Sequence, residues 1–215
     1  MSMSTIAKAV IPIKRFERGK TRLSERLSDP ERAQLSRSMF ERVLNASLAC
    51  PKLDGTLVLT DATAIARDVR TRGADVLEDP ALAADTQLTA ARLGVLIDTA
   101  FAHLRAQGVG VVLVLMGDLP RVEPGDLTAL LAALDDADLA LAPDLRGECT
   151  NALALRFGPA ANHFRTAFGG PGSLELHTKT ARELGLRVRV EKNPRLGLDL
   201  DTPADLDLLA GLHQD

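Results

Sequence analysis

The eight residues 109–116 restrict the fold of this chain more than any other segment. They read Val-Gly-Val-Val-Leu-Val-Leu-Met and are bounded by Gly108 and Gly117. A run this short and this continuously apolar is typical of a strand whose two faces are both covered by helices. Because such strands belong to parallel sheets, the segment predicts an α/β protein with helices on both faces of a mainly parallel sheet.

Predicted strands and helices alternate along the rest of the 215-residue chain. Short apolar runs predict strands at residues 6–13, 55–60, 74–77, 137–142, 149–155 and 186–190. Apolar residues at helical spacing predict helices at residues 28–49, 62–72, 86–107, 124–134, 159–168, 173–184 and 203–212. This alternation indicates a mainly parallel sheet with right-handed crossovers. The sequence shows no internal repeat, low-complexity tract or linker, so we predict a single domain, residues 1–215. The less regular residues 147–194 are a candidate lobe over the sheet, where an acceptor substrate would bind.

Charge and aromatic content exclude several classes of partner. The net charge is −3 and the chain has no Trp or Tyr, so it offers neither a basic surface nor a stacking platform for nucleic acid. The longest apolar run, residues 109–116, is too short to span a bilayer, and the first residues lack the apolar core of a signal peptide. We therefore expect a cytoplasmic protein without a nucleic-acid or membrane partner. The two cysteines and four histidines lack the spacing of a zinc site.

A cationic loop follows the first predicted strand. Five basic residues stand within residues 14–22: Lys14, Arg15, Arg18, Lys20 and Arg22. Such a loop, with a glycine at position 19, can surround a triphosphate with positive charge and backbone N–H groups. A solvated surface loop is the alternative interpretation. The loop is not a Walker A motif, which would need glycine where Arg15 stands.

Carboxylates stand where ligands bind in open parallel sheets, beyond the carboxyl ends of the strands. Asp118 directly follows the central strand, and Asp199 and Asp201 flank a single leucine, so both point to one side of an extended chain. Together they can hold a divalent cation such as Mg²⁺. Simpler interpretations are a turn at Asp118 and a helix N-cap at Asp201 or Thr202 before Pro203.

A third candidate segment is rich in glycine. Residues 169–173 read Gly-Gly-Pro-Gly-Ser before a predicted helix, and Thr150-Asn151 stands upstream. Glycines followed by Ser at a helix start can bind a carboxylate or a phosphate. A flexible turn is the alternative.

Taken in order, these segments resemble one known family. They are residues 12–14 (Pro-Ile-Lys), 20–24 (Lys-Thr-Arg-Leu-Ser), 117–120 (Gly-Asp-Leu-Pro), 142–144 (Ala-Pro-Asp), 150–153 (Thr-Asn-Ala-Leu), 168–177 (with Phe168, Ser173 and His177) and 199–203 (Asp-Leu-Asp-Thr-Pro). The chain is similar to the 2-phospho-L-lactate/phosphoenolpyruvate guanylyltransferases of coenzyme F420 biosynthesis. The resemblance covers nearly the whole chain, from about Val10 to Leu209.

The resemblance implies a Rossmann-like nucleotide-diphospho-sugar transferase fold and a reaction of GTP with a phosphorylated three-carbon acid. It implies roles for nine residues: Lys14, Lys20 and Arg22 as catalytic and GTP-phosphate-binding residues, Asp118, Asp199 and Asp201 as Mg²⁺ ligands, and Thr150, Gly170 and Ser173 as binders of the acceptor's carboxylate. The product would be handed to the transferase that acts on the F420 precursor. A homodimer is a possible assembly.

Two positions depart from the family pattern. Thr89 stands where relatives usually carry Asn, in a segment that helps to define the nucleotide or acceptor pocket, and we assign Thr89 to nucleotide binding. Cys149 stands where relatives often have glycine, so a side chain there can reshape the acceptor pocket. The choice among 2-phospho-L-lactate, phosphoenolpyruvate and 3-phospho-D-glycerate as acceptor therefore stays open.

Two other functions remain as alternatives. A molybdenum-cofactor or sugar-phosphate nucleotidyltransferase would usually open with a glycine-rich loop, where this chain has Pro-Ile-Lys. A non-catalytic nucleotide-binding module would tolerate loss of the acidic residues, all three of which are present.

Overall fold

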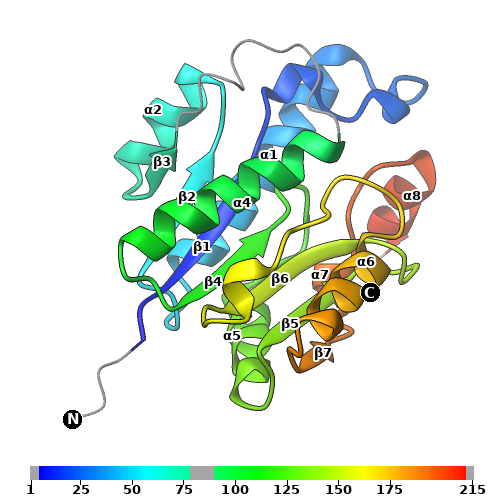
Figure 1. The fold of residues 1–215 in the computed structure, drawn as a ribbon. Helices are drawn as coiled ribbons and strands as arrows, with labels where there is room; N and C mark the ends of the chain where they lie inside the picture. The colour runs from blue at the N-terminus through cyan, green and yellow to red at the C-terminus, as the bar shows by residue number, and fades with distance from the viewer. Residues whose placement is uncertain (1–4, 78–89, 212–215) are drawn as a thin grey trace.

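The computed structural model describes residues 5–77 and 90–211, which form a seven-stranded sheet with helices on both faces (Figure 1). The strands are β1 (Ala7–Pro12), β2 (Gly55–Leu59), β3 (Asp75–Leu77), β4 (Val111–Leu115), β5 (Leu139–Pro143), β6 (Thr150–Arg156) and β7 (Val188–Val190). Their order is β3-β2-β1-β4-β6-β5-β7. All neighbouring pairs are parallel except those of β6, which runs antiparallel to β4 and to β5. The predicted mainly parallel α/β sheet is confirmed.

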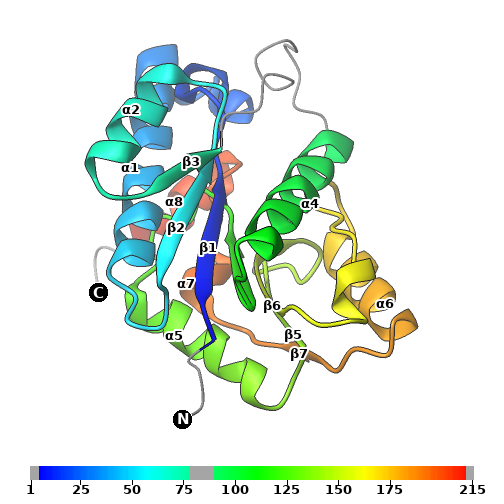
Figure 2. The ribbon, with the colours of Figure 1, turned by 60° about the vertical axis from the view of Figure 1, so that its left-hand side comes forward.

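The helices of the described residues are α1 (Asp29–Leu48), α2 (Thr63–Thr71), α4 (Ala90–Ala106), α5 (Pro124–Ala132), α6 (Ser173–Glu183), α7 (Pro194–Gly197) and α8 (Pro203–Gly211). Figure 2 shows α1 and α2 on one side of the sheet and α4 and α6 on the other. Within the described residues no helix is long and apolar enough to cross a membrane.

Alternation along β4 explains why this strand is apolar throughout. Leu113 and Leu115 pack into the core beneath α1 and α5, whereas Val112 and Val114 pack into the core beneath α4 and α6. Because successive side chains point to opposite faces, a strand covered on both faces must be apolar at every position. The same alternation gives the sheet its two cores.

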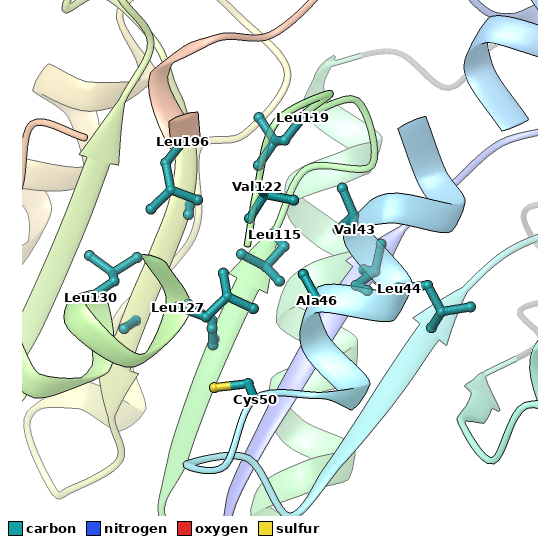
Figure 3. Packing of buried hydrophobic residues seen from close by; sticks show 14 of the residues in the cluster. Val43, Leu44, Ala46, Cys50, Leu115, Leu119, Val122, Leu127, Leu130 and Leu196 are labelled. Atoms are coloured by element: carbon teal, nitrogen blue, oxygen red, sulfur yellow. The ribbon is translucent and has the colours of Figure 1, made fainter. Parts of the chain in front are cut away.

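Two buried apolar side chains anchor the loop after β4 in the core. Figure 3 shows Leu119 and Val122 inserted beside Leu115 of β4 and Leu196 of α7, and both loop residues are buried. Gly117 fits a narrow space, since a Cβ there would lie 3.1 Å from the Ile13 side chain and 3.3 Å from the Pro12 carbonyl oxygen. Asp118 is therefore fixed beside the end of β1.

The reversed direction of β6 matters for the site. Leu115, the last residue of β4, is paired with Ala152 near the start of β6, so Thr150 lies at the edge where β1 and β4 end. Residues 147–194 contribute β6 and β7 to the sheet and α6 to one of its faces.

One predicted helix is wrong over most of its length. Residues 159–168 contain only a short 3-10 turn, Ala161–His163. The backbone that follows is held by side chains of neighbouring helices: Thr166 N–H donates to Asp98 of α4 (3.0 Å), and Ala167 N–H donates to His177 of α6 (2.8 Å). Buried Phe164 and Phe168 anchor this extended segment in the core, and their spacing of four residues resembles a helical pattern.

Candidate active site

A cavity of about 320 Å³ opens at the carboxyl ends of β1 and β4. Its wall comes from the loop after β1, from α1 and α4, from the end of β4, and from Gly169 and Asp201. The lining includes the cations Lys14, Arg15 and Lys20. It also includes apolar side chains, among them Leu93 and Leu96 of α4. The cavity therefore combines positive charge that can bind phosphate groups with apolar side chains that a nucleobase can contact.

The cationic loop owes its shape to two apolar anchors. Phe16 is buried and packs against Phe40 of α1 with 5.9 Å between ring centroids, and Leu23 is fully buried. Between these anchors, Lys20 adopts a left-handed backbone conformation (φ 56°), which side chains other than glycine seldom take. The residue with this unusual backbone conformation is the one whose side chain contacts Asp118 and Asp201.

Lys20 joins three distant parts of the chain. Its Nζ lies 2.7 Å from Asp118 Oδ2 and 2.7 Å from Asp201 Oδ1, and only 7% of its side chain is exposed. Burial alone would lower the pKa of Lys20, but the charges of Asp118 and Asp201 hold it above its usual range. Lys20 is therefore a permanent cation at the centre of the site.

Asp201 faces cations on several sides. Burial by itself raises the pKa of Asp201, but the charges of Lys20, Arg22 and Lys14 together hold it below its usual range. The loop cations and the strand-end carboxylates thus lie together, although Lys14 and Arg22 are exposed and Lys20 makes the direct contacts. The helix that follows begins at Pro203, and the Asp205 carboxylate accepts from the backbone N–H of Thr202. The Asp201 carboxylate is bonded to Lys20 instead.

Asp199 is the residue of the acidic cluster whose pKa is raised. Burial raises its pKa to about 6, and the nearby charge of Asp118 adds to the shift. The amide of Asn151 opposes it by donating to Asp199 Oδ1 at 3.3 Å, while also donating to the carbonyl oxygens of Leu196 and Gly197. Asn151 thereby fixes the segment between α7 and α8 against β6.

The acidic residues fit a magnesium ion by their chemistry, since Mg²⁺ prefers carboxylate oxygens. The raised pKa of Asp199 reports negative charge that Lys20 alone leaves incompletely balanced. In the part of the chain that the structure describes, however, no three Asp, Glu, His or Cys side chains form a ready metal site. Lys20 Nζ lies between two of the carboxylates instead, so their role as metal ligands stays a prediction.

The predicted acceptor residues lie together at the start of β6. Thr150 N–H donates to Ser173 Oγ at 2.9 Å, and both residues are buried. Gly172 has a left-handed backbone (φ 76°) just before α6, as the glycine-rich sequence requires. Cys149 Sγ lies 3.8 Å from the Gly170 carbonyl oxygen, so the cysteine contacts the glycine loop directly. Of the described residues in this segment, Gly169 lines the cavity, whereas Thr150 and Ser173 are buried beside the glycine loop and are not among the lining residues.

Two residues at the site, Asn151 and His177, stand in the candidate segments but had no assigned role. Asn151 orients Asp199, and His177 bonds Thr150, with 3.0 Å between His177 Nδ1 and Thr150 Oγ1. Asn151 stands next to Thr150 in sequence, but its partner is 48 residues away, so only the fold reveals the contact. Thr89 lies outside the described residues.

Comparison with known proteins agrees with this geometry. The family described as guanylyl transferase CofC like matches residues 7–214. A phosphoenolpyruvate guanylyltransferase of Sphaerobacter thermophilus is 35% identical over 209 residues, 97% of this chain and 94% of the relative. A 2-phospho-L-lactate guanylyltransferase of Halorubrum lacusprofundi is 37% identical over 190 residues, 88% of this chain and 78% of the relative.

Solved structures support the fold. A protein assigned as a nucleotide-diphospho-sugar transferase from Desulfovibrio desulfuricans G20 superimposes with a TM-score of 0.75, covering 98% of this chain and 89% of the other at 17% identity. The CMP:2-keto-3-deoxy-manno-octonic acid synthetase complexed with CTP superimposes with a TM-score of 0.60, covering 98% and 99% at 15% identity. The fold is that of the nucleotide-diphospho-sugar transferases. The chain is a nucleotidyltransferase, and it belongs to the guanylyl transferase CofC-like family.

Proposed function

We propose that this protein transfers the GMP group of GTP to a phosphorylated three-carbon acid and releases pyrophosphate, as a step of coenzyme F420 biosynthesis. The observation that carries the proposal is the convergence of the cationic loop and the strand-end carboxylates on one cavity, with Lys20 bonded to both Asp118 and Asp201. The names of the relatives, which include phosphoenolpyruvate and 2-phospho-L-lactate guanylyltransferases, support the choice of nucleotide and acceptor class.

The chemistry requires no nucleophilic side chain. A phosphate oxygen of the acceptor attacks the α-phosphorus of GTP, and a new P–O bond forms. The bond from the α-phosphorus to the oxygen bridging to the β-phosphate breaks, and pyrophosphate leaves with the electron pair. Catalysis then depends on positioning two polyanions in line and on neutralising their mutual repulsion.

The cationic loop supplies much of that neutralisation. All three cations Lys14, Arg15 and Lys20 line the cavity; Lys14 and Arg15 are exposed, whereas the Lys20 side chain is 7% exposed. Arg15 is steadied by Asp61, whose Oδ2 lies 3.5 Å from Arg15 Nε. Positive groups fixed before the substrate arrives stabilise the charge that develops on the leaving pyrophosphate without further reorganisation.

We propose that Mg²⁺ is bound by Asp118, Asp199 and Asp201. When bound, it would supply charge neutralisation and a template for the phosphate oxygens. The chain's own part is to hold the carboxylates: Leu119 and Val122 fix the Asp118 loop, and Asn151 fixes Asp199. Thr150, Gly170 and Ser173 are proposed to bind the acceptor's carboxylate at the rim formed by the glycine loop.

The test is pyrophosphate release by the purified protein with Mg²⁺ and GTP. Phosphoenolpyruvate, 2-phospho-L-lactate and 3-phospho-D-glycerate are supplied separately, with ATP and CTP as nucleotide controls. We expect release that needs GTP and one of the acids. Release with ATP or CTP at the same rate, or no release with any acid from folded protein that still binds GTP, would refute the proposal.

Asp118→Asn is the matching variant. We expect it to keep the fold and to lose about 100-fold or more in kcat, because it removes a carboxylate that is proposed to hold Mg²⁺ at the reacting phosphates. Asp75→Asn is the control, since Asp75 pairs with Lys8 on β1 and its side chain is 64% exposed. Full activity of folded Asp118→Asn would remove this residue from the catalytic site.

A further inference from the structure

His177 is held in one orientation by its surroundings. The residue lies on α6 and is fully buried. Its ring packs against Phe168 and Phe164, with 4.7 Å and 5.9 Å between ring centroids. Each of the two ring nitrogens of the imidazole has one hydrogen-bond partner.

The partner of Nε2 identifies the tautomer. Ala167 N–H donates to Nε2 at 2.8 Å, and a backbone N–H can only donate, so Nε2 carries a lone pair. Burial lowers the pKa of His177 to about 4, so the ring is neutral at pH 7. A neutral imidazole has one hydrogen, which must therefore be on Nδ1.

The direction of the next hydrogen bond follows. Nδ1 lies 3.0 Å from Thr150 Oγ1, and because Nδ1 bears the hydrogen, it donates and the hydroxyl accepts. The hydroxyl hydrogen of Thr150 is then left over. Within the described residues, no acceptor is recorded for it, although Thr150 is only 3% exposed. A buried hydroxyl hydrogen without an acceptor is costly unless a ligand accepts it.

We infer that His177 is a positioning residue for the acceptor substrate: it turns the Thr150 hydroxyl so that its hydrogen donates to the acceptor's carboxylate. The inference rests on the proposed function for the identity of the ligand. His177 itself does not touch the substrate and transfers no proton. It acts through its tautomer: because Nδ1 carries the hydrogen, the Thr150 hydroxyl cannot donate to the imidazole and its own hydrogen points elsewhere.

The location of Thr150 suits this role. The residue stands at the edge of the sheet where β1 and β4 end, and its own N–H is bonded to Ser173 Oγ beneath the glycine loop. Gly169 of that loop lines the cavity. Figure 1 shows α6, which carries both Ser173 and His177, packed beside the start of β6. A carboxylate at this rim would accept from a hydroxyl whose orientation was already set.

Two amide substitutions separate positioning from packing. The side-chain amide of His177→Asn reaches the place of Nδ1 and keeps a donor for Thr150, whereas that of His177→Gln reaches the place of Nε2 and keeps a partner for Ala167. Each variant loses the ring and one buried hydrogen bond, so a purely structural role predicts similar kinetics for both. We expect the acceptor KM to rise about tenfold in His177→Gln and less than about threefold in His177→Asn, with the GTP KM unchanged in both.

A double-variant cycle tests whether His177 acts through Thr150. Thr150→Val removes the hydroxyl but keeps the shape. If the hydroxyl transmits the whole effect, adding His177→Gln to Thr150→Val raises the acceptor KM no further. Independent, multiplicative effects of the two substitutions would overturn the inference, as would equal acceptor KM values for the Asn and Gln variants.

Nuclear magnetic resonance of the unliganded wild-type protein provides a readout that needs no activity. The ¹⁵N shifts of His177 distinguish a protonated Nδ1 from a protonated Nε2, and we expect the Nδ1–H tautomer from pH 6 to pH 8. The Nε2–H tautomer or a charged ring in that range would overturn the inference. Absence of pyrophosphate release by wild-type protein would instead refute the proposed function, and the tautomer measurement would still decide the orientation of Thr150.

Discussion

At the scale of single residues, the negative charges of the three carboxylates at the site are only partly balanced by the cation that contacts them. Asp118, Asp199 and Asp201 gather near one buried ammonium, Lys20, which bonds only the first and the last of them. Asp199 is left with burial and like charges, which raise its pKa from 3.8 to about 6. Such a cost is expected where function, rather than folding, selects the residues.

Removing the charge of Asp199 should therefore stabilise the metal-free protein. An acid whose pKa is raised by folding contributes stability that is present below its unfolded pKa and is lost as the pH rises through its folded pKa. For Asp199 this loss falls between about pH 4 and pH 6. We expect Asp199→Asn to be more stable than wild type by about 1–2 kcal/mol at pH 7, allowing for solvent screening, and equally stable below pH 4.

The measurement is urea unfolding of both proteins in buffer containing a chelator, from pH 3.5 to pH 8. The same variant should be inactive in pyrophosphate release, so that stability and activity move in opposite directions. A variant less stable than wild type at pH 7 would show that the Asn151 contact outweighs the charge repulsion at Asp199.

Ser173 provides a residue-scale test of the acceptor site. Its hydroxyl accepts from Thr150 N–H at 2.9 Å at the start of α6. We expect Ser173→Ala to raise the acceptor KM about tenfold while the GTP KM changes less than about twofold, because the variant loses a hydroxyl on the acceptor side only. Ser38→Ala on the exposed face of α1 is the control. An effect confined to GTP would move the glycine loop to the nucleotide side.

At the scale of elements, the cationic loop is shaped by its contact with α1. Gly19 is the point of closest approach: a Cβ there would lie 2.8 Å from Ser36 Oγ and 3.3 Å from the Phe16 carbonyl oxygen. Ser36 Oγ is buried and has no hydrogen-bond partner among the described residues. The loop and helix therefore fit by shape rather than by a polar contact.

This fit predicts a pair of compensating substitutions. Gly19→Ala should cost about 1–2 kcal/mol of stability and raise the GTP KM, because the added methyl group displaces the residue before Lys20. Ser36→Ala alone should be close to neutral, since the lost hydroxyl makes no bond. The double variant should recover much of the stability lost in Gly19→Ala. Unfolding by urea measures all four proteins, and simple addition of the two effects would contradict the proposed contact.

Element boundaries show what local sequence can predict. The start of α1 was predictable from Ser28 and Pro30, and the structure has a capping box there, with Ser28 N–H donating to Glu31 at 2.8 Å. The predicted helix at residues 159–168 failed because its backbone bonds go to Asp98 and His177 on other helices. Local rules predict an element well where its hydrogen bonds are local, and they fail where other elements satisfy its backbone.

At the scale of the whole molecule, the parallel sheet is what made the site partly predictable. The ends of β1 and β4 lie at one edge of the sheet, so the cations after β1 and Asp118 after β4 lie together there. The antiparallel β6 was not predictable from its own sequence, yet it brings Thr150 and Asn151 to the same edge. Long-range contacts such as Lys20 with Asp201, 181 residues apart, follow from this arrangement rather than from any motif.

The same long-range contact makes the assembled site sensitive to one cation. Lys20→Met would leave Asp118, Asp199 and Asp201 without their central positive charge, whereas the apolar part of the side chain is kept. We expect the variant to be about 1–3 kcal/mol less stable than wild type at pH 7 in the presence of a chelator. This cost is smaller than that of breaking a fully buried ion pair, because the Asp201 side chain is 46% exposed.

Added Mg²⁺ should then stabilise the Lys20→Met variant more than wild type, because a divalent cation can take the place of the ammonium between the carboxylates. Thermal unfolding across a Mg²⁺ titration without nucleotide measures this difference. Lys8→Met is the control, since Lys8 forms a more exposed ion pair with Asp75 at 2.9 Å, and neither residue lines the cavity. Equal stabilisation of all three proteins by Mg²⁺ would mean that the acidic cluster does not bind the cation where Lys20 lies, and the proposed metal ligands would have to be sought elsewhere.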